Sequence, residues 1–292
     1  MKTSKLFSLT AILLAVAGFY QVAAAAPPSM NASLGIAMAE VFNSLDLLES
    51  QSQFGCESNG TPCLFGAVLR PGQTITLKRV FDCSQSWALV AAGDEDVEAI
   101  DISVTDPFGR LLLKNDTLGA RQTAVFQPGT LGLHTITLTL SDAEVPCTVF
   151  LATLIDEGIR LSPDARHQAA LQLFQHYDNL NSLSIEVNLL PSHCATWSVY
   201  GSVLNDEQRA TIHHLNSGSG ERLIICGQNE THVDLDLQLF SATRQLLAED
   251  IEPDSTPVIQ ATLSDEITSL IIKNAGSGNP PTFVLTAVLT AE

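Results

Sequence analysis

The chain has 292 residues, a length that fits one large domain or two ordinary ones. Its formal net charge is −18, with 32 acidic residues against 14 Lys and Arg. Nucleic acids and anionic lipids bind proteins through basic patches, so this charge excludes a nucleic-acid partner and disfavours an anionic membrane. It suits a solvated protein or one that meets cations.

The first 26 residues have the three parts of a secretory signal peptide. Lys2 and Lys5 precede the apolar run Leu6–Val16, and Gln21–Ala26 offers small residues for cleavage, which we expect near Ala25. A membrane anchor is the alternative, but the apolar run is short and lacks a basic flank. No later run of apolar residues is long enough to span a bilayer. We therefore expect an exported protein, periplasmic or extracellular, with no membrane insertion after cleavage.

A segment of the mature chain returns later in almost the same form. Phe65–Leu77 (FGAVLRPGQTITL) and Tyr200–Ile212 (YGSVLNDEQRATI) share an aromatic residue, a Gly, a small residue, Val-Leu, three turn residues and a Gln. Tyr200 lies 135 positions after Phe65. This similarity suggests an internal duplication.

Four further pairs of segments extend the repeat. Asp101–Val104 matches Asp236–Leu239, Leu111-Leu112 matches Leu246-Leu247, Val149–Ile155 matches Phe283–Leu289, and Met38–Leu48 matches Ala170–Leu180. KND, ending at Asp116, aligns with AED, ending at Asp250, after one deletion. A chance match over one stretch is easy, but a register kept over five is not. The sequence therefore predicts two tandem units, residues 27–158 and 159–292.

Each unit begins with a predicted amphipathic helix. Ser162-Pro163-Asp164 supplies an N-cap, a proline for the first turn and an early acid. Apolar residues then recur at helical spacing in both units: Ala165, Ala169, Leu173 and Tyr177 in the second, and Leu34, Met38, Val41, Phe42, Leu45 and Leu48 in the first. Such a stripe is typical of a packing face, so we expect each helix to lie on a strand module.

The rest of each unit alternates with the period of a β-strand. In Val233–Phe240 (VDLDLQLF) every second residue is apolar, which predicts one buried and one solvated face. Leu133–Leu140 and Ser269–Asn274 have strand patterns too, and turn pairs such as Pro71-Gly72 and Pro128-Gly129 separate the strands. Short strands at this spacing predict a mainly β protein of two tandem antiparallel β-sandwiches, each preceded by an amphipathic helix.

These residues resemble the bacterial pre-peptidase C-terminal domain. The first unit has Gly66 and Leu69, Asp101, the turn DPFG (Asp106–Gly109), Leu111-Leu112, Asn115-Asp116 and Gly132–Ile136, although His134 stands where the family has Tyr. The second has Gly201 and Leu204, DLDL (Asp234–Leu237), Leu246-Leu247 and Asp250. It departs from the pattern at SATR (Ser241–Arg244), which lacks the turn glycine, and at Asp265-Glu266, where a glycine is expected. The resemblance implies a jelly-roll-like sandwich, a non-catalytic appendage of secreted hydrolases, and Ca²⁺ binding in some members.

The six cysteines, in a chain with an export signal, indicate disulfides rather than a metal site. We expect Cys56–Cys63 to close the loop CESNGTPC, where Asn59-Gly60 permits a tight turn. Six cysteines allow fifteen pairings, so the other two bridges are weaker predictions. Pairing within units suggests Cys83–Cys147 and Cys194–Cys226.

Carboxylates are the candidate metal ligands. Asp234 and Asp236 share one strand face and Asp250 follows a hairpin later, while Asp101 and Asp116 stand in the first unit. Oxygen ligands at a loop rim suit Ca²⁺, although a solvated strand face and turn-capping Asp residues explain the same pattern. His213 and His214 are adjacent on a strand and point to opposite faces, so they are poor co-ligands.

No catalytic motif is present, which favours a non-catalytic binding or scaffolding protein with a protein or polysaccharide partner outside the cytoplasm. Two alternatives stay open: a secreted hydrolase without a recognisable motif, and a Ca²⁺-dependent carbohydrate binder. Exposed aromatic side chains in a groove would favour the carbohydrate binder, and a deep pocket with clustered carboxylates would favour the hydrolase. Trp87 and Trp197 stand in apolar strand contexts and are expected in the core.

Overall fold

The computed structural model describes residues 30–182, 187–191, 196–215, 219–230, 233–263, 268–276 and 281–291. The predicted signal peptide and Cys194 lie outside these ranges. The described chain is mainly β and includes two long helices, α1 (Met30–Gln51) and α2 (Pro163–Ser182). Neither is long and apolar enough to cross a membrane.

The first unit is a sandwich of two antiparallel sheets. One has the order β2 (Leu64–Leu69), β9 (Cys147–Asp156), β4 (Trp87–Gly93), β7 (Arg121–Phe126). The other has the order β3 (Thr74–Phe81), β8 (Gly132–Ala143), β5 (Val97–Thr105), β6 (Leu111–Asn115). Counted along the chain from β2, the first sheet holds the first, eighth, third and sixth strands, and the second holds the second, seventh, fourth and fifth. This is the strand order of a jelly roll.

The second unit repeats that order strand for strand. Its first sheet runs β11 (Val199–Leu204), β18 (Thr282–Ala291), β13 (Gly220–Gln228), β16 (Val258–Leu263). Its second runs β12 (Arg209–Leu215), β17 (Thr268–Asn274), β14 (Leu235–Phe240), β15 (Leu246–Asp250). Short strands add to each unit at matching places, β1 (Phe54–Gly55) beside β9 and β10 (Val187–Leu189) beside β18. The predicted class, two antiparallel sandwiches each led by a helix, is confirmed.

The two units share one sheet, which the sequence did not predict. β2 pairs with β11, so the two first sheets join into a single sheet of ten strands. The central pair of the junction is Phe65 opposite Tyr200, flanked by Gly66 opposite Val199 and Leu64 opposite Gly201. Phe65 and Tyr200 are equivalent residues of the repeat, so a local two-fold axis passes between them. The segment that reveals the duplication is therefore the segment that joins its halves.

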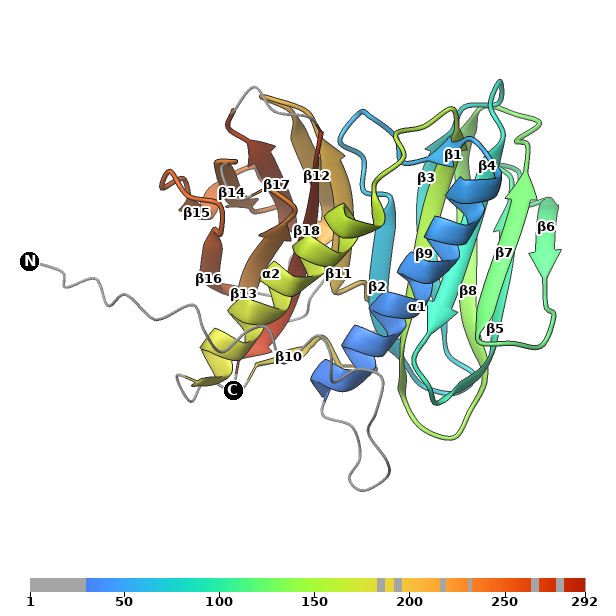
Figure 1. Cartoon of the computed structure of the whole chain (residues 1–292), viewed down its shortest axis with the longest axis horizontal. Helices are drawn as coiled ribbons and strands as arrows, with labels where there is room; N and C mark the ends of the chain where they lie inside the picture. The colour runs from blue at the N-terminus through green and yellow to red at the C-terminus, as the bar shows by residue number, and fades with distance from the viewer. Residues whose placement is uncertain are drawn as a thin grey trace, which may run out of the picture.

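The ten-stranded sheet is covered on both faces. One face packs against the two four-stranded sheets, and its core includes Trp87 and Trp197, which are 0% and 7% exposed, as predicted. The other face carries the helices, α1 over β4 and β9 and α2 over β13 and β18 (Figure 1). The predicted N-cap of α2 is present, since Ala165 N donates to Ser162 Oγ at 3.1 Å.

A buried ion cluster ties the two helices together. Arg166 of α2 is 1% exposed and pairs with Asp46 and Glu49 of α1. Burial raises the pKa of Glu49, while the Arg166 guanidinium acts in the opposite direction. A buried cation is costly unless it is paired, so this cluster fixes how the helices meet.

Strand pairing corrects the sequence alignment at two places. Asn115 faces Ile102 as Asp250 faces Leu237, so the counterpart of Asp250 is Asn115, not Asp116, and no deletion is needed. Val149 likewise corresponds to Val284 and not to Phe283, because the two valines lie in the sandwich core while Phe283 faces the helices. A slip of one residue moves a strand position to the other face, which apolar residues on both faces had concealed.

The cysteines divide into three cases. The Sγ atoms of Cys56 and Cys63 lie 3.1 Å apart, so the predicted bridge between them stays a prediction with its two sulfurs adjacent. The pairing Cys83–Cys147 is wrong: Cys83 precedes the Trp87 end of β4, whereas Cys147 lies beyond its Gly93 end, about 20 Å away along the strand. Cys226 is fully buried and contacts Thr286 Oγ1 at 3.2 Å, and its predicted partner Cys194 is outside the described residues.

Candidate functional site

The outer faces of the two four-stranded sheets are the broad strand surfaces left to solvent, because the ten-stranded sheet is covered on both sides. These faces are built from equivalent strands. Differences between them therefore show where one unit has acquired surface chemistry that the other lacks.

The outer face in the first unit carries a row of small hydroxyl residues. Thr74 lies opposite Thr139 and Thr76 opposite Thr137, and β5 places Ser103 beside Thr137. Thr74 Oγ1 and Thr139 Oγ1 share a hydrogen bond of 3.0 Å. Threonine is a favoured residue on a solvated strand face, so β-propensity accounts for this surface.

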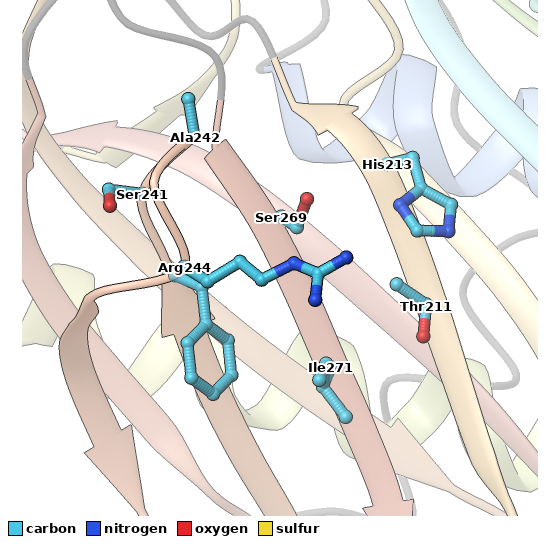
Figure 2. A pocket seen from close by; sticks show the side chains of 8 residues that line it. Thr211, His213, Ser241, Ala242, Arg244, Ser269 and Ile271 are labelled. Carbon is cyan, nitrogen blue, oxygen red and sulfur yellow. The ribbon is translucent and has the colours of Figure 1, made fainter.

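The outer face in the second unit is hollowed instead. A pocket of about 550 Å³ opens over β12, β17 and the end of β14, within the size range of small-molecule sites. Its walls combine an arginine, a histidine and an aromatic ring with hydroxyl and aliphatic groups, from Thr211, His213, Phe240, Ser241, Ala242, Arg244, Ser269 and Ile271. Figure 2 shows the Arg244 side chain extending over the sheet toward Ser269, Ile271 and Thr211.

Arg244 occupies a position that belongs to a glycine in the first unit. Gly109 has φ 80° and Arg244 has φ 63°, in the same turn between equivalent strands. The turn hydrogen bonds are conserved: Gly109 N donates to Asp106 O and Arg244 N donates to Ser241 O, both at 2.9 Å. The left-handed region costs a residue with a side chain about 1–2 kcal/mol, so the second unit keeps the turn while bearing that cost.

The turn in the first unit neutralises its own arginine, and the turn in the second does not. Arg110 Nε donates to Asp106 Oδ2 at 2.6 Å. Ser241 stands at the position of Asp106 and caps the turn through its hydroxyl, which accepts from Gln245 N at 3.1 Å. In the part of the chain that the structure describes, the Arg244 guanidinium has no hydrogen-bond or ion-pair partner.

A second strained replacement of glycine is compensated, which sets Arg244 apart. Gly72, with φ 75°, corresponds to Glu207, with φ 58°. Glu207 pairs with Lys273 Nζ at 3.0 Å, so its side chain is used inside the protein. The Arg244 side chain instead lies over the pocket (Figure 2).

The predicted Ca²⁺ ligands do not converge. Asp236 lies on the outer face opposite Lys273, whereas Asp250 lies opposite the buried Leu237 and accepts from Val258 N at 2.8 Å. Burial raises the pKa of Asp236, and the charge of Asp234 adds to the effect.

In the first unit, Asp101 and Asp116 both act on Lys114 and raise its pKa, Asp116 more strongly. Asp116 is paired with Lys114 at 2.6 Å, and Asp101 stands opposite Thr139 on the outer face. Over the described residues, no three His, Cys, Asp or Glu side chains gather closely enough to hold a metal ion. The five aspartates therefore fit a solvated strand face and turn caps better than a shared site.

A smaller pocket of about 280 Å³ lies beside the Cys56–Cys63 loop. Glu57, Asp156 and Glu157 line it, but Glu57 is engaged by the buried Arg79. The backbones of Gly55 and Gly158 cross here so closely that a Cβ on either would meet the other at under 3 Å. This tight crossing gives the pocket a structural explanation.

One feature of the larger pocket, the missing turn glycine, is visible in the sequence, but its consequence for the surface is not. In the sequence, SATR (Ser241–Arg244) departs from the family pattern by lacking the turn glycine, and His213 has only the chemistry of a metal ligand to mark it. The informative signal was the identity of the replacement, a cation at a position that demands a left-handed backbone. The convergence of Phe240, Ile271 and Thr211 around it required the sheet register.

Comparison with known proteins adds no family. No protein-family model and no curated protein matches the sequence. Solved structures that resemble it include the M60 catalytic domain with the CBM51-1 and CBM51-2 domains of Clostridium perfringens ZmpB, at TM-score 0.26 and 6% identity, covering 77% of this chain and 34% of that one. The PBSX exported protein XepA resembles it at TM-score 0.27 and 11% identity, with 80% and 88% coverage. The chain thus spans about a third of the first of these structures, and none of the similarities is close enough to support a functional argument.

Proposed function

We propose that this protein is an exported, non-catalytic binding protein that holds a polysaccharide in the pocket on the outer face of β12, β17 and β14. The observation that carries the proposal is the composition of that pocket. It combines an aromatic ring, Phe240, with hydroxyl groups and a charged side chain, and none of the described carboxylates lines it. Sugar rings present apolar C–H faces and many hydroxyl groups, which such a lining complements.

The same composition argues against a hydrolase at this site. Glycoside hydrolysis in most families needs a pair of carboxyl groups, one of them as proton donor. Among the described residues, the pocket walls offer neither member of such a pair. The resemblance to the pre-peptidase C-terminal domain, which implies a non-catalytic appendage, agrees with this proposal and is itself a prediction, as is export by the signal peptide.

The test is affinity gel electrophoresis of the mature full-length chain against a panel of neutral and acidic soluble polysaccharides. We expect at least one polysaccharide to retard the wild-type protein. Ile271→Trp, which fills the pocket, should abolish the retardation, and Thr137→Trp, at the matching position in the first unit, should not. Absence of retardation by every polysaccharide would contradict the proposal. So would shortening of the bound polysaccharide during incubation, which would indicate a hydrolase.

A further inference from the structure

We infer that the pocket recognises a carboxylate on its saccharide ligand, and that Arg244 is the residue that binds it. This inference rests on the proposed function and names the chemical class of the ligand. Its starting point is that Arg244 carries a permanent positive charge into a pocket whose described walls hold no carboxylate to neutralise it.

Arg244 is exposed, whereas three other arginines of the chain are paired with carboxylates. The protein has 14 basic residues for 32 acidic ones, and these pairs are Arg79 with Glu57, Arg110 with Asp106, and Arg166 with Asp46. Arg244 stands where the first unit has Gly109, and it keeps the left-handed backbone of that glycine. An internal partner, which would account for the arginine structurally, is absent among the described residues.

The surroundings of Arg244 favour a carboxylate over a more highly charged group. A guanidinium matches a carboxylate with two parallel hydrogen bonds. The described lining supplies no second permanent cation, and the net charge of −18 repels ligands that are densely anionic. Thr211 and Ser269 add hydroxyl groups beside the arginine (Figure 2). Phe240 and Ile271 add apolar groups to the lining. A carboxylated sugar carries all three kinds of partner on one ring.

The experiment measures the affinity of the full-length protein for digalacturonate and for its fully methyl-esterified form, by titration calorimetry. The two probes have the same sugar rings and differ in charge. We expect the acid to bind roughly 10- to 100-fold more tightly than the ester, because hydrogen bonds between ionised groups are about twice as strong as neutral ones. Raising the NaCl concentration should weaken binding of the acid only.

Arg244→Gly provides the decisive variant, because it restores the residue of the first unit. It should reduce affinity for the acid roughly 10- to 100-fold, leave affinity for the ester unchanged, and leave the melting temperature unchanged or higher. Arg244→Asn, another change to a residue that tolerates a left-handed backbone, should behave in the same way. Lys78→Gln, which removes one exposed charge from the matching sheet of the first unit, should change neither affinity.

Three outcomes would overturn the inference. Equal affinity of the wild type for the acid and the ester would show that the pocket does not recognise the carboxylate. The proposed function would still stand if Ile271→Trp abolishes binding. If the wild type bound a sulfated disaccharide as tightly as digalacturonate, the pocket would recognise anions in general and not carboxylates. A fall of several degrees in the melting temperature of Arg244→Gly would show that the arginine is needed for stability. If the polysaccharide panel shows no binding at all, the proposed function itself fails.

Discussion

The two units have the same strand order and similar cores, but they differ in the outer faces of their four-stranded sheets and in two turns. At the two turns that differ, the first unit has Gly72 and Gly109, and its outer face carries a row of threonines. The second has Glu207 and Arg244 at those positions and a pocket where the threonines would be. A fold needed only for stability gives no reason to replace a glycine that suits its backbone. The second unit is therefore the one in which we place the proposed binding surface.

The largest effect should arise where the two units are most alike, at the local two-fold axis. Phe65 contacts Tyr200 and Trp197 with ring centroids 6.1 and 5.6 Å apart. Phe65→Ala and Tyr200→Ala should each lower the free energy of unfolding by about 3–5 kcal/mol, as is usual for buried aromatic residues. Urea unfolding measures both. A loss below about 1 kcal/mol for either variant would mean that the junction does not hold the units together.

Tyr200→Phe is the matched control for that pair. The Tyr200 hydroxyl donates to Trp197 O at 2.9 Å inside the core. Removing it while keeping the ring should cost about 1 kcal/mol, the contribution of one buried hydrogen bond. A cost as large as that of Tyr200→Ala would assign the stabilisation to the hydroxyl and not to the packing of the rings.

The Cys56–Cys63 loop breaks the symmetry, because Ser198 stands at the position of Cys63 in the second unit. Gly60 of this loop lies against Arg209 O of the second unit, so the loop spans the junction. If the bridge forms, a closed loop of this length should contribute about 2–3 kcal/mol. The double variant Cys56→Ser, Cys63→Ser should lose that amount in urea unfolding.

Peptide mapping without reduction identifies the bridge directly. We expect Cys56 and Cys63 in one linked peptide pair, and Cys83, the exposed thiol, to react with a thiol reagent in the native protein. A link between Cys83 and Cys147 would contradict the strand topology, because β4 separates the two residues.

A buried carboxylate in the first unit corresponds to an amide in the second. Asp94 Oδ2 accepts from Thr148 N, and Asn229 Oδ1 accepts from Phe283 N, both at 2.7 Å. Burial raises the pKa of Asp94 to about 6, although the hydrogen bond from Thr148 acts in the opposite direction. Because the folded pKa lies above the ordinary value of 3.8, stability present at low pH is lost as pH rises through 6.

Asp94→Asn should therefore stabilise the protein at pH 7.5, by about 1–3 kcal/mol, with the gain disappearing below about pH 4. Asn229→Asp should show the reverse, a loss near neutral pH that shrinks on acidification. Urea unfolding across this pH range measures both. An Asp94→Asn gain that does not vary with pH would show that the carboxyl charge is not the cause.

Much of the fold followed from the sequence because period-two alternation is set by burial. Leu235, Leu237 and Leu239 are buried and Asp236 and Gln238 are not, as the alternation predicts. The junction between β2 and β11 did not follow, because backbone hydrogen bonds make it and apolar residues occupy both faces of each strand.

In the sequence, the pocket on the second unit shows only as a departure from the repeat. The sequence shows that Ser241–Arg244 lacks a glycine, but the left-handed φ of Arg244 depends on the turn geometry, and whether the guanidinium finds a partner depends on what the fold brings near it. The Ca²⁺ hypothesis met the same limit, since residues close in sequence, such as Asp236 and Asp250, lie on opposite faces of one sheet.

The smallest expected effect concerns Glu207, whose left-handed backbone is accompanied by an ion pair, in contrast to Arg244. Glu207→Gly should relieve a left-handed backbone but remove the ion pair with Lys273, and these contributions of about 1 kcal/mol each nearly cancel. Gly72→Glu, the reverse change in the first unit, should cost about 1–2 kcal/mol, because Thr139 stands at the position of Lys273 and offers no charge. Adding Thr139→Lys should recover part of that loss, which a double-mutant cycle in urea measures.

Recovery would show that the second unit tolerates Glu207 through its internal partner. Arg244 has no such partner among the described residues, so the cost of its left-handed backbone would stay uncompensated inside the protein. A cycle in which the two substitutions simply add, with no coupling between them, would remove this distinction between Glu207 and Arg244.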